Sequence, residues 1–328
     1  MPQPSASDVH VNRPLTNISV AYIQQASDFV AGQVFPQIGV AKQSDRYFKY
    51  PKEFWFRNMV QKRAPATESA GGGWDLDNTP SYFCEKFAIH QDLDDDIRQN
   101  QDDPLNLDRD ATQWVTQQRL QKRDIDWAAE YFKKSVWGVD RDGVSATPTG
   151  GQFLQWNDSS SDPVTDVSNS AVEITENTGY RPNTLVVGPY VYNELRNNAS
   201  ILDRIKYTQR GQVSRDLLAS LFDVDKFVVA WGTKDAGEDG SAQSDADMGF
   251  IFGKGALLVY SNPTPSLMTP SGGYIFSWTG LMGAGAFGNR INRFRKPEIQ
   301  SDRVEGEMAY DMKVVAPDVA TFFATAVA

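Results

Sequence analysis

The sequence predicts an α+β fold, and three observations lead to that prediction. Aromatic residues line two strand-like segments within residues 46–90, and Gly71-Gly72-Gly73 supplies the turn between them. One long, mostly polar helix follows at about residues 105–136. Beyond Tyr180, short strands and short helices alternate in mixed order, which is typical of α+β proteins.

Residues 1–45 are expected to form an N-terminal arm. Pro2, Pro4 and Pro14 block regular secondary structure in its first part, whereas Phe29 and Phe35 provide apolar anchors further on. Such a segment either tucks into its own domain or reaches onto a neighbouring molecule.

Residues 46–90, the extended loop, are unusually rich in aromatic side chains. The outgoing segment holds Tyr47, Phe48, Tyr50, Phe54, Trp55 and Phe56, and the return arm holds Tyr82, Phe83, Phe87 and Ile89. A two-stranded ribbon alone is marginally stable in water, so this one needs a surface to lie on. That surface belongs either to its own domain or to another copy of the chain.

The second possibility makes charged and aromatic residues of the extended loop candidates for a subunit interface. We expect the basic residues of this loop to meet an acidic run on a neighbour. The interface candidates are Arg57, Lys62, Arg63, Glu68 and Trp74 on the loop, and Asp92, Asp94, Asp95 and Asp96 in the acidic run.

The long helix is expected to cross the subunit with its middle largely solvated. Pro104 precedes it, and Asp102, Asp103 and Asp108 complement the positive end of the helix dipole. Gly138 is a suitable stop. A second helix begins at Pro163 after the capping residue Asp162 and ends before Gly179, while residues 143–162 between the two helices are expected to be irregular.

The rest of the chain divides into short elements separated by turn residues. Strands are predicted at residues 184–187, 226–230, 250–252, 256–260, 274–278, 303–307 and 310–315. Helices are predicted at 189–197 and 215–222, and a hydrophilic loop at 234–247.

Composition narrows the classes of function. The net charge of −10 gives no overall attraction to phosphate backbones, so a sequence-reading nucleic-acid binder is not expected. Cys84 is the one cysteine, which removes intrachain disulfides and cysteine-cluster zinc sites. With no signal peptide and no apolar run of membrane length, we expect a soluble protein that works without export.

No motif points to catalysis, a cofactor or a metal. A calcium loop starting at Asp92 would need glycine where Ile97 stands, and would end at Asp103 instead of glutamate. The glycines at 71–73 lack the Lys-Ser/Thr of a phosphate loop, and those at 280–288 do not match a dinucleotide fingerprint. A pair of carboxylates that acts with some of the eight tryptophans on carbohydrate stays open as an alternative.

The order of the elements, together with four stretches of sequence, resembles the major capsid proteins of tailed bacteriophages. Residues 178–188 resemble the strand that opens the family's axial domain, and residues 217–229 its next helix–strand step. Residues 301–306 and 310–315 resemble the closing strands, and residues 67–73 resemble the tip of the extended loop in one branch of the family. The likeness spans nearly the whole chain and lies in order and spacing, not in one motif.

The resemblance implies the Hong Kong ninety-seven-type capsid fold. It assigns the N-terminal arm to residues 1–45, the extended loop to 46–90, a peripheral domain with the spine helix 105–136 to 91–179 and 296–328, and an axial domain to 180–295. Residues 234–247 then lie near the capsomer centre or form an ordinary surface loop.

The implied function is that of a structural protein and not an enzyme. Pentamers and hexamers would build an icosahedral shell around double-stranded phage DNA, without sequence specificity, in the host bacterial cytoplasm. The implied partners are scaffolding, portal and decoration proteins, with no membrane. Two alternatives remain: a bacterial encapsulin-type nanocompartment shell, and a monomeric carbohydrate-active enzyme.

Overall fold

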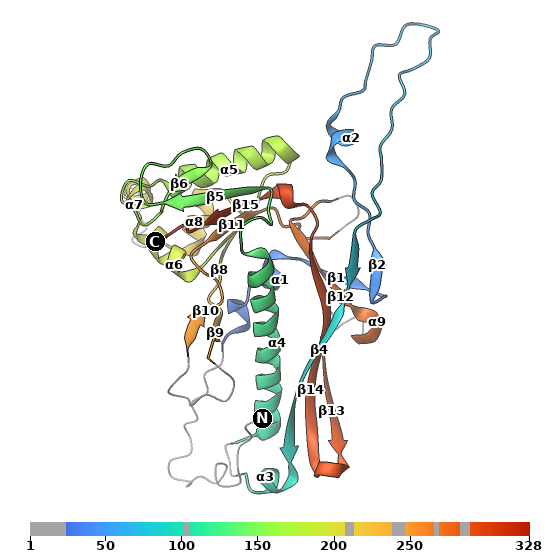
Figure 1. The fold of residues 1–328 in the computed structure, drawn as a ribbon, viewed down its shortest axis with the longest axis vertical. Coiled ribbons are helices and arrows are strands. Elements are labelled where there is room, and N and C mark those ends of the chain that lie inside the picture. Colours follow the sequence, from blue (N-terminus) through green and yellow to red (C-terminus); the bar gives the residue numbers. More distant parts are fainter. Residues whose placement is uncertain (1–23, 102–104, 207–212, 238–246, 266–268, 283–288) are drawn as a thin grey trace.

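The computed structural model describes residues 24–101, 105–206, 213–237, 247–265, 269–282 and 289–328. Figure 1 shows an elongated molecule in which a sheet covered by helices lies at one end and long strands run alongside the helix α4 toward the other. A thin open loop projects well beyond both parts (Figure 1).

A six-stranded sheet forms the helix-covered end, in the order β6-β5-β15-β11-β7-β8. Its strands are β5 (Val139–Val144), β6 (Gln152–Leu154), β7 (Thr184–Val187), β8 (Lys226–Val229), β11 (Ala256–Val259) and β15 (Ala320–Ala324). The three central strands β7, β11 and β15 are buried along their whole length, which explains their continuous apolar sequences.

Helices α5 (Pro163–Thr178), α6 (Pro189–Asn197), α7 (Ala199–Ile205) and α8 (Arg215–Phe222) pack their apolar faces with this sheet in one core cluster. The predicted bounds of α5, α6 and α8 are confirmed. Gly179 ends α5 in the left-handed region at φ +72°, and the Ser214 hydroxyl accepts a hydrogen bond from the Leu217 N–H at the start of α8. Asp162 precedes α5, and its side chain accepts from the Thr165 hydroxyl in the first turn of the helix as well as from Ser200 and Arg204.

A five-stranded sheet extends along the other side of the molecule. Its strands are β1 (Gln37–Val40), β4 (Glu85–Asp94), β12 (Gly273–Trp278), β13 (Asn289–Lys296) and β14 (Ser301–Val314). The two closing strands predicted at 303–307 and 310–315 are one strand, β14, because Met308 and Ala309 continue the ladder opposite Phe87 and Lys86. Its centre touches α4 at Gly306, where a Cβ atom would lie 2.2 Å from the Val115 side chain.

Helix α4 (Leu107–Tyr131) is the predicted spine helix, and it ends earlier than expected because Phe132 leaves the helical conformation. The Asn106 side chain caps it by accepting from the Arg109 N–H at 3.0 Å. Val115 and Trp127 are fully buried, whereas most of the polar residues between them are partly exposed. Pro104, Asp102 and Asp103, which we expected at its start, lie outside the described residues.

The described part of the N-terminal arm tucks into its own subunit. It contains η2 (Ala26–Asp28) and α1 (Ala31–Val34) before β1 pairs with β12. The buried Asp124 carboxylate on α4 accepts hydrogen bonds from the N–H groups of Val30 and Ala31, at 2.7 and 2.9 Å. The Phe35 ring packs edge-on against Trp127 at 5.4 Å between ring centres. The predicted arm at 1–23, with Pro2, Pro4 and Pro14, lies outside the described residues.

Shorter elements complete the fold: β2 (Ser44–Arg46), α2 (Lys52–Phe56), β3 (Ser81–Phe83), α3 (Asp95–Gln99), β9 (Thr233–Asp235), β10 (Met248–Phe250), α9 (Thr279–Met282), η5 (Pro297–Ile299) and η6 (Pro317–Val319). Three predictions are corrected here. The aromatic segment at 47–56 contains the short helix α2 and little strand, residues 143–162 include β6, and the strand expected at 250–252 lies at 248–250.

The sheets divide the chain differently from the expected domain boundaries. β15, within the range 296–328 assigned to a peripheral domain, lies near the centre of the six-stranded sheet with β7 and β11. β12 and most of β13, within the range 180–295 assigned to an axial domain, pair with β14 in the other sheet. Strand pairing joins residues far apart in sequence, so contiguous ranges do not describe it. The names axial and peripheral stay predictions.

Candidate subunit interface

Residues 47–80, between β2 and β3, form the projecting segment seen at the upper end of Figure 1. Its two arms meet in a single isolated bridge between Lys49 and Asp77, with both backbone hydrogen bonds at 2.8 and 2.9 Å. Beyond that bridge the described backbone forms no strand ladder. The segment therefore lacks the internal pairing that would stabilise it as an independent hairpin.

The base of the segment is fixed to its own subunit. The Tyr47 and Tyr82 rings both stack on Phe276 of β12, at 5.5 and 4.7 Å between ring centres. The Lys52 ammonium group pairs with Asp318 at 2.7 Å. The Phe56 ring lies against Gly179, where a Cβ atom would approach it to 2.9 Å. These contacts fix the direction in which the segment leaves the body.

Large apolar side chains remain uncovered along the segment. Exposed fractions are 52% for Trp55, 63% for Phe56, 88% for Val60 and 66% for Trp74. Trp55 and Trp74 meet across the two arms at 6.1 Å between ring centres, but each stays more than half exposed. Several large apolar side chains left uncovered on one segment indicate a site of interaction.

All five loop residues predicted for the interface lie exposed on the projecting segment. Arg63 binds within the segment, because its Nε donates to the Thr67 carbonyl. Arg57, Lys62 and Glu68 form no ion pair with any other described residue. Exposure is what a contact with a second molecule requires, but the contact itself stays a prediction.

The predicted acidic run is largely engaged inside the subunit. Asp92 accepts two hydrogen bonds from the Arg303 guanidinium, at 2.7 and 2.8 Å. Asp95 binds Arg295, with one contact at 2.6 Å, and Asp94 caps α3 by accepting from the Asp96 N–H at 2.8 Å. The hydrogen bonds of Arg303 and Arg295 hold the pKa values of Asp92 and Asp95 below their usual range.

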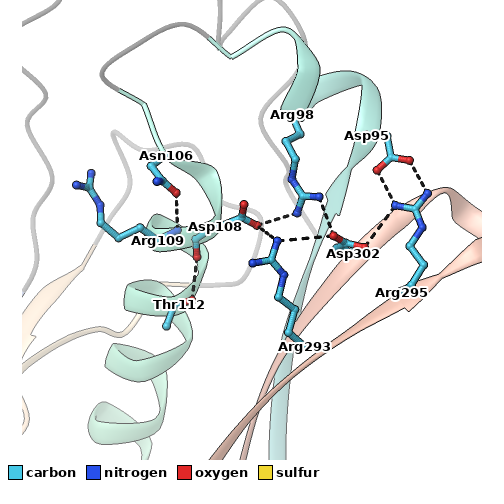
Figure 2. Close-up of polar contacts among 9 residues, drawn as sticks. All are labelled: Asp95, Arg98, Asn106, Asp108, Arg109, Thr112, Arg293, Arg295 and Asp302. Atoms are coloured by element: carbon cyan, nitrogen blue, oxygen red, sulfur yellow. Dashed lines mark hydrogen bonds and ion pairs between the residues drawn. The ribbon is translucent and has the colours of Figure 1, made fainter.

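Sequence reasoning missed the ion-pair network to which Asp95 belongs (Figure 2). Arg98 of α3 contacts Asp108 of α4 and Asp302 of β14, each at 2.7 Å. Arg293 of β13 reaches the same Asp108 at 2.6 Å. The network thus joins α3, the start of α4 and the β13–β14 hairpin. Arg293 and Arg295 stand two residues apart, and such residues lie on the same face of a strand. This spacing could have predicted the two neighbouring cations.

A second internal network surrounds Glu307, which is 3% exposed at the centre of β14. Its carboxylate binds Lys86 of β4 and both Arg290 and Asn292 of β13. Burial raises the pKa of Glu307, but the hydrogen bonds from Lys86 and Arg290 outweigh burial, and the pKa lies below its ordinary value. The strands β4, β13 and β14 are therefore held together by charge as well as by backbone pairing.

Within the described residues, no three His, Cys, Asp or Glu side chains are grouped so as to hold a metal ion. Cys84 is fully buried, its thiol donates to the Phe276 carbonyl at 3.4 Å, and burial raises its pKa to about 12. No helix of the described chain combines the length and the apolar character needed to cross a membrane.

Comparison with known proteins gives consistent results. No protein-family model matches the chain. The major capsid protein of Burkholderia phage BcepMu is 27% identical to it over 222 residues, which are 67% of this chain and 68% of that protein. The crystal structure of a phage-related protein from Bordetella bronchiseptica matches with a TM-score of 0.67 at 18% identity, over 92% of this chain and 93% of the other.

Capsid structures share the same fold. The capsid structure of cyanophage P-SCSP1u has a TM-score of 0.58 at 11% identity, over 98% of this chain and 94% of the other. The SrpI encapsulin complex of Synechococcus elongatus has a TM-score of 0.55 at 11% identity, over 98% and 95%. The α+β fold and the predicted resemblance to phage major capsid proteins are confirmed.

Proposed function

We infer that this chain is a phage major capsid protein, a structural protein whose copies associate into a shell. We propose further that the copies form pentamers and hexamers of an icosahedral shell that encloses phage DNA. The observation that carries the proposal is the projecting segment, whose rings stay uncovered in a subunit that has the fold of capsid proteins.

The physical argument begins with the uncovered surface. Trp55, Phe56, Val60 and Trp74 are each more than half exposed, and covering apolar surface stabilises an association by about 25 cal/mol per Å². The segment leaves the body of its own subunit (Figure 1), and we propose that a second copy covers it through a different face. Such a heterologous contact closes into a ring when the rotation between copies divides a full turn.

The negative net charge of the chain favours a shell whose wall does not bind DNA strongly. At a net charge of −10 the inner surface would not adhere strongly to DNA, so we propose that the cargo is held without sequence recognition. We propose scaffolding, portal and decoration proteins as further partners, assembly in the cytoplasm of the host bacterium, and no enzymatic activity.

An encapsulin-type nanocompartment shell is the second candidate, because an encapsulin has the same fold over nearly the whole chain. The contents of purified particles separate the two candidates. A phage shell encloses double-stranded DNA after packaging, whereas a nanocompartment encloses an enzyme.

Sedimentation and negative-stain electron microscopy of the purified chain test the proposal. We expect discrete capsomers or megadalton particles, because the uncovered rings drive association. A single-copy species at all concentrations, with the projecting segment folded back onto its own body, would contradict the proposal and favour the monomeric carbohydrate-active enzyme.

A further inference from the structure

We propose that a groove between β4, β14 and α4 receives the basic arm of the projecting segment of a second copy. The contact would be made by the stretch 57–62, through Arg57 and Lys62. This inference rests on the proposed function, because it requires that copies of the chain associate.

The groove is a cavity of about 280 Å³ whose lining combines apolar side chains with charged ones. Phe83 of β3, Phe87 of β4 and Met312 of β14 line it. Phe83 is 54% exposed although it lies at the foot of the loop, and Phe87 packs against Tyr310 at 5.2 Å between ring centres. The lining therefore includes a partly exposed ring that an apolar side chain from outside can cover.

Four carboxylates and a single lysine line the same groove, and the Lys122 ammonium group lies over the Phe87 ring at 5.2 Å, so acids outnumber cations there. The two inner carboxylates are held by the subunit. Asp126 accepts from the Tyr310 hydroxyl at 3.0 Å and from Lys122 at 2.6 Å, and Asp311 accepts from the Phe83 N–H at 2.8 Å.

The two outer carboxylates, Glu85 and Glu130, are exposed and form no ion pair with another described residue. The groove thus combines apolar side chains, such as Phe83 and Met312, with two carboxylates that have no cation of their own among those residues.

The outgoing arm of the projecting segment has the complementary pattern. Residues 49–63 contain five cations and one acid, Glu53, in a chain whose net charge is −10. Lys52 is taken by Asp318, and Arg63 binds inside the segment. Lys49 lies at the foot of the segment, where its backbone pairs with that of Asp77. Further out, Arg57 and Lys62 remain, and Val60 between them is 88% exposed. The stretch 57–62 therefore presents an apolar side chain between two cations, which matches the groove in both charge and polarity.

Two observations point to a second copy as the source of this arm. In its own subunit the segment runs away from β4 and α4, whose residues line the groove (Figure 1), and the stacking of Tyr47 on Phe276 together with the Lys52–Asp318 pair fixes that direction. The other acidic partner that we considered, at residues 92–96, already has Asp92 and Asp95 bound to arginines of its own chain. The groove is therefore a better receptor for the stretch 57–62 than residues 92–96 are.

A charge swap tests the proposal with the full-length chain. The receptor variant carries Glu85→Lys and Glu130→Lys, and the donor variant carries Arg57→Glu and Lys62→Glu. We expect each variant alone to reduce the yield of particles in sedimentation at least about tenfold, and the chain with all four substitutions to return to within about twofold of the unaltered protein. The matched control, Glu176→Lys with Glu194→Lys on α5 and α6, changes the net charge as the receptor variant does and should leave the yield unchanged.

The outcomes separate this inference from the proposed function. If the unaltered chain assembles and the fourfold variant stays as defective as its parents, the groove is not the receptor, although the chain is still a shell protein. If the unaltered chain does not assemble at all, the proposed function itself fails.

A disulfide test decides the matter if a charge variant fails to fold. One chain carries Lys62→Cys and the other Glu130→Cys, and the two are mixed before assembly and oxidised. Native Cys84 is fully buried, and the pKa of its thiol is about 12, so it gives little background. A disulfide-linked dimer on a non-reducing gel supports the groove, with Asp94→Cys as the control receptor that should give none. Assembled particles in which the two introduced thiols stay unlinked would overturn the proposal.

Discussion

The projecting segment and the opposite end of the molecule carry the same kinds of residues but use them differently. At the end shown in Figure 2, each of Arg98, Arg293 and Arg295 binds at least one aspartate of its own chain. On the projecting segment, Arg57 and Lys62 have no such partner among the described residues, and the rings of Trp55 and Trp74 stay more than half exposed. Charge that is paired internally serves the fold, whereas unpaired charge beside uncovered rings is available to another molecule.

Removing most of the projecting segment should have the largest effect on assembly. In this variant a Gly-Ser-Gly linker replaces residues 57–75 and leaves α2 and the Lys49–Asp77 bridge in place. We expect loss of particles in sedimentation, with unchanged circular dichroism, because both sheets lie outside the deletion. Gly71→Ala is the control, since a Cβ atom there meets nothing within 4 Å. Normal particles from the shortened chain would show that the segment is not an interface.

A substitution in the ion-pair network around Glu307 should lower folding stability rather than disrupt the contact between copies. Glu307→Gln leaves Lys86 and Arg290 without a carboxylate at the centre of the strand β14. We expect the free energy of unfolding to fall by about 2 kcal/mol, less than the roughly 3–5 kcal/mol of a fully buried pair, because both cations are partly exposed and can rehydrate. Urea denaturation of the dissociated subunit measures it. An unchanged midpoint would mean that the network contributes nothing to the fold.

Loss of a single uncovered ring should weaken assembly moderately. Trp74→Ser removes a side chain that is 66% exposed in the subunit, so folding stability should hardly change. If a neighbour covers this ring, the concentration needed for assembly should rise about tenfold, which corresponds to about 1.4 kcal/mol. Light scattering across a concentration series measures the change. The control is Trp114→Ser on α4, where the ring is 40% exposed.

The smallest expected effect is a change in the pH dependence of stability that arises from Asp124, whose carboxylate binds the N-terminal arm. Burial raises the pKa of Asp124 to about 6, against the opposing effect of the hydrogen bonds from Ala31 and Val30. A raised pKa in the folded state means that this group's contribution to stability is fully present below its unfolded pKa of about 4, and is lost as the pH rises through about 6. Asp124→Asn should remove that slope from unfolding midpoints measured between about pH 4 and pH 7.

The contribution of Asp95 and Asp302 to stability should depend on pH in the opposite way (Figure 2). Hydrogen bonds from Arg98 and Arg295 lower the pKa values of Asp302 and Asp95, so their contribution is present above about pH 4 and is lost as the pH falls through the lowered values. A slope that survives in Asp124→Asn would assign it to another group.

Local sequence signals predicted the helices well. Pro163 and Gly179 bracket α5, Ser214 caps α8, and the 3.6-residue pattern after Leu107 marks α4, because each signal acts within one or two helical turns. The interface candidates of the extended loop were also predicted from local features, and all of them prove exposed. The strands were predicted less well than the helices. β15 was missed, and β14 was predicted as two strands.

The sequence by itself determined the helices α4, α5, α6 and α8, which residues are apolar, and that an aromatic loop precedes a long helix. Only the tertiary structure decided that Asp92 and Asp95 face arginines of their own chain while Arg57 and Lys62 face no described partner. The reason is distance along the chain. Asp92 and Arg303 become neighbours through the pairing of β4 with β14, and no pattern in either stretch records which strand lies beside it.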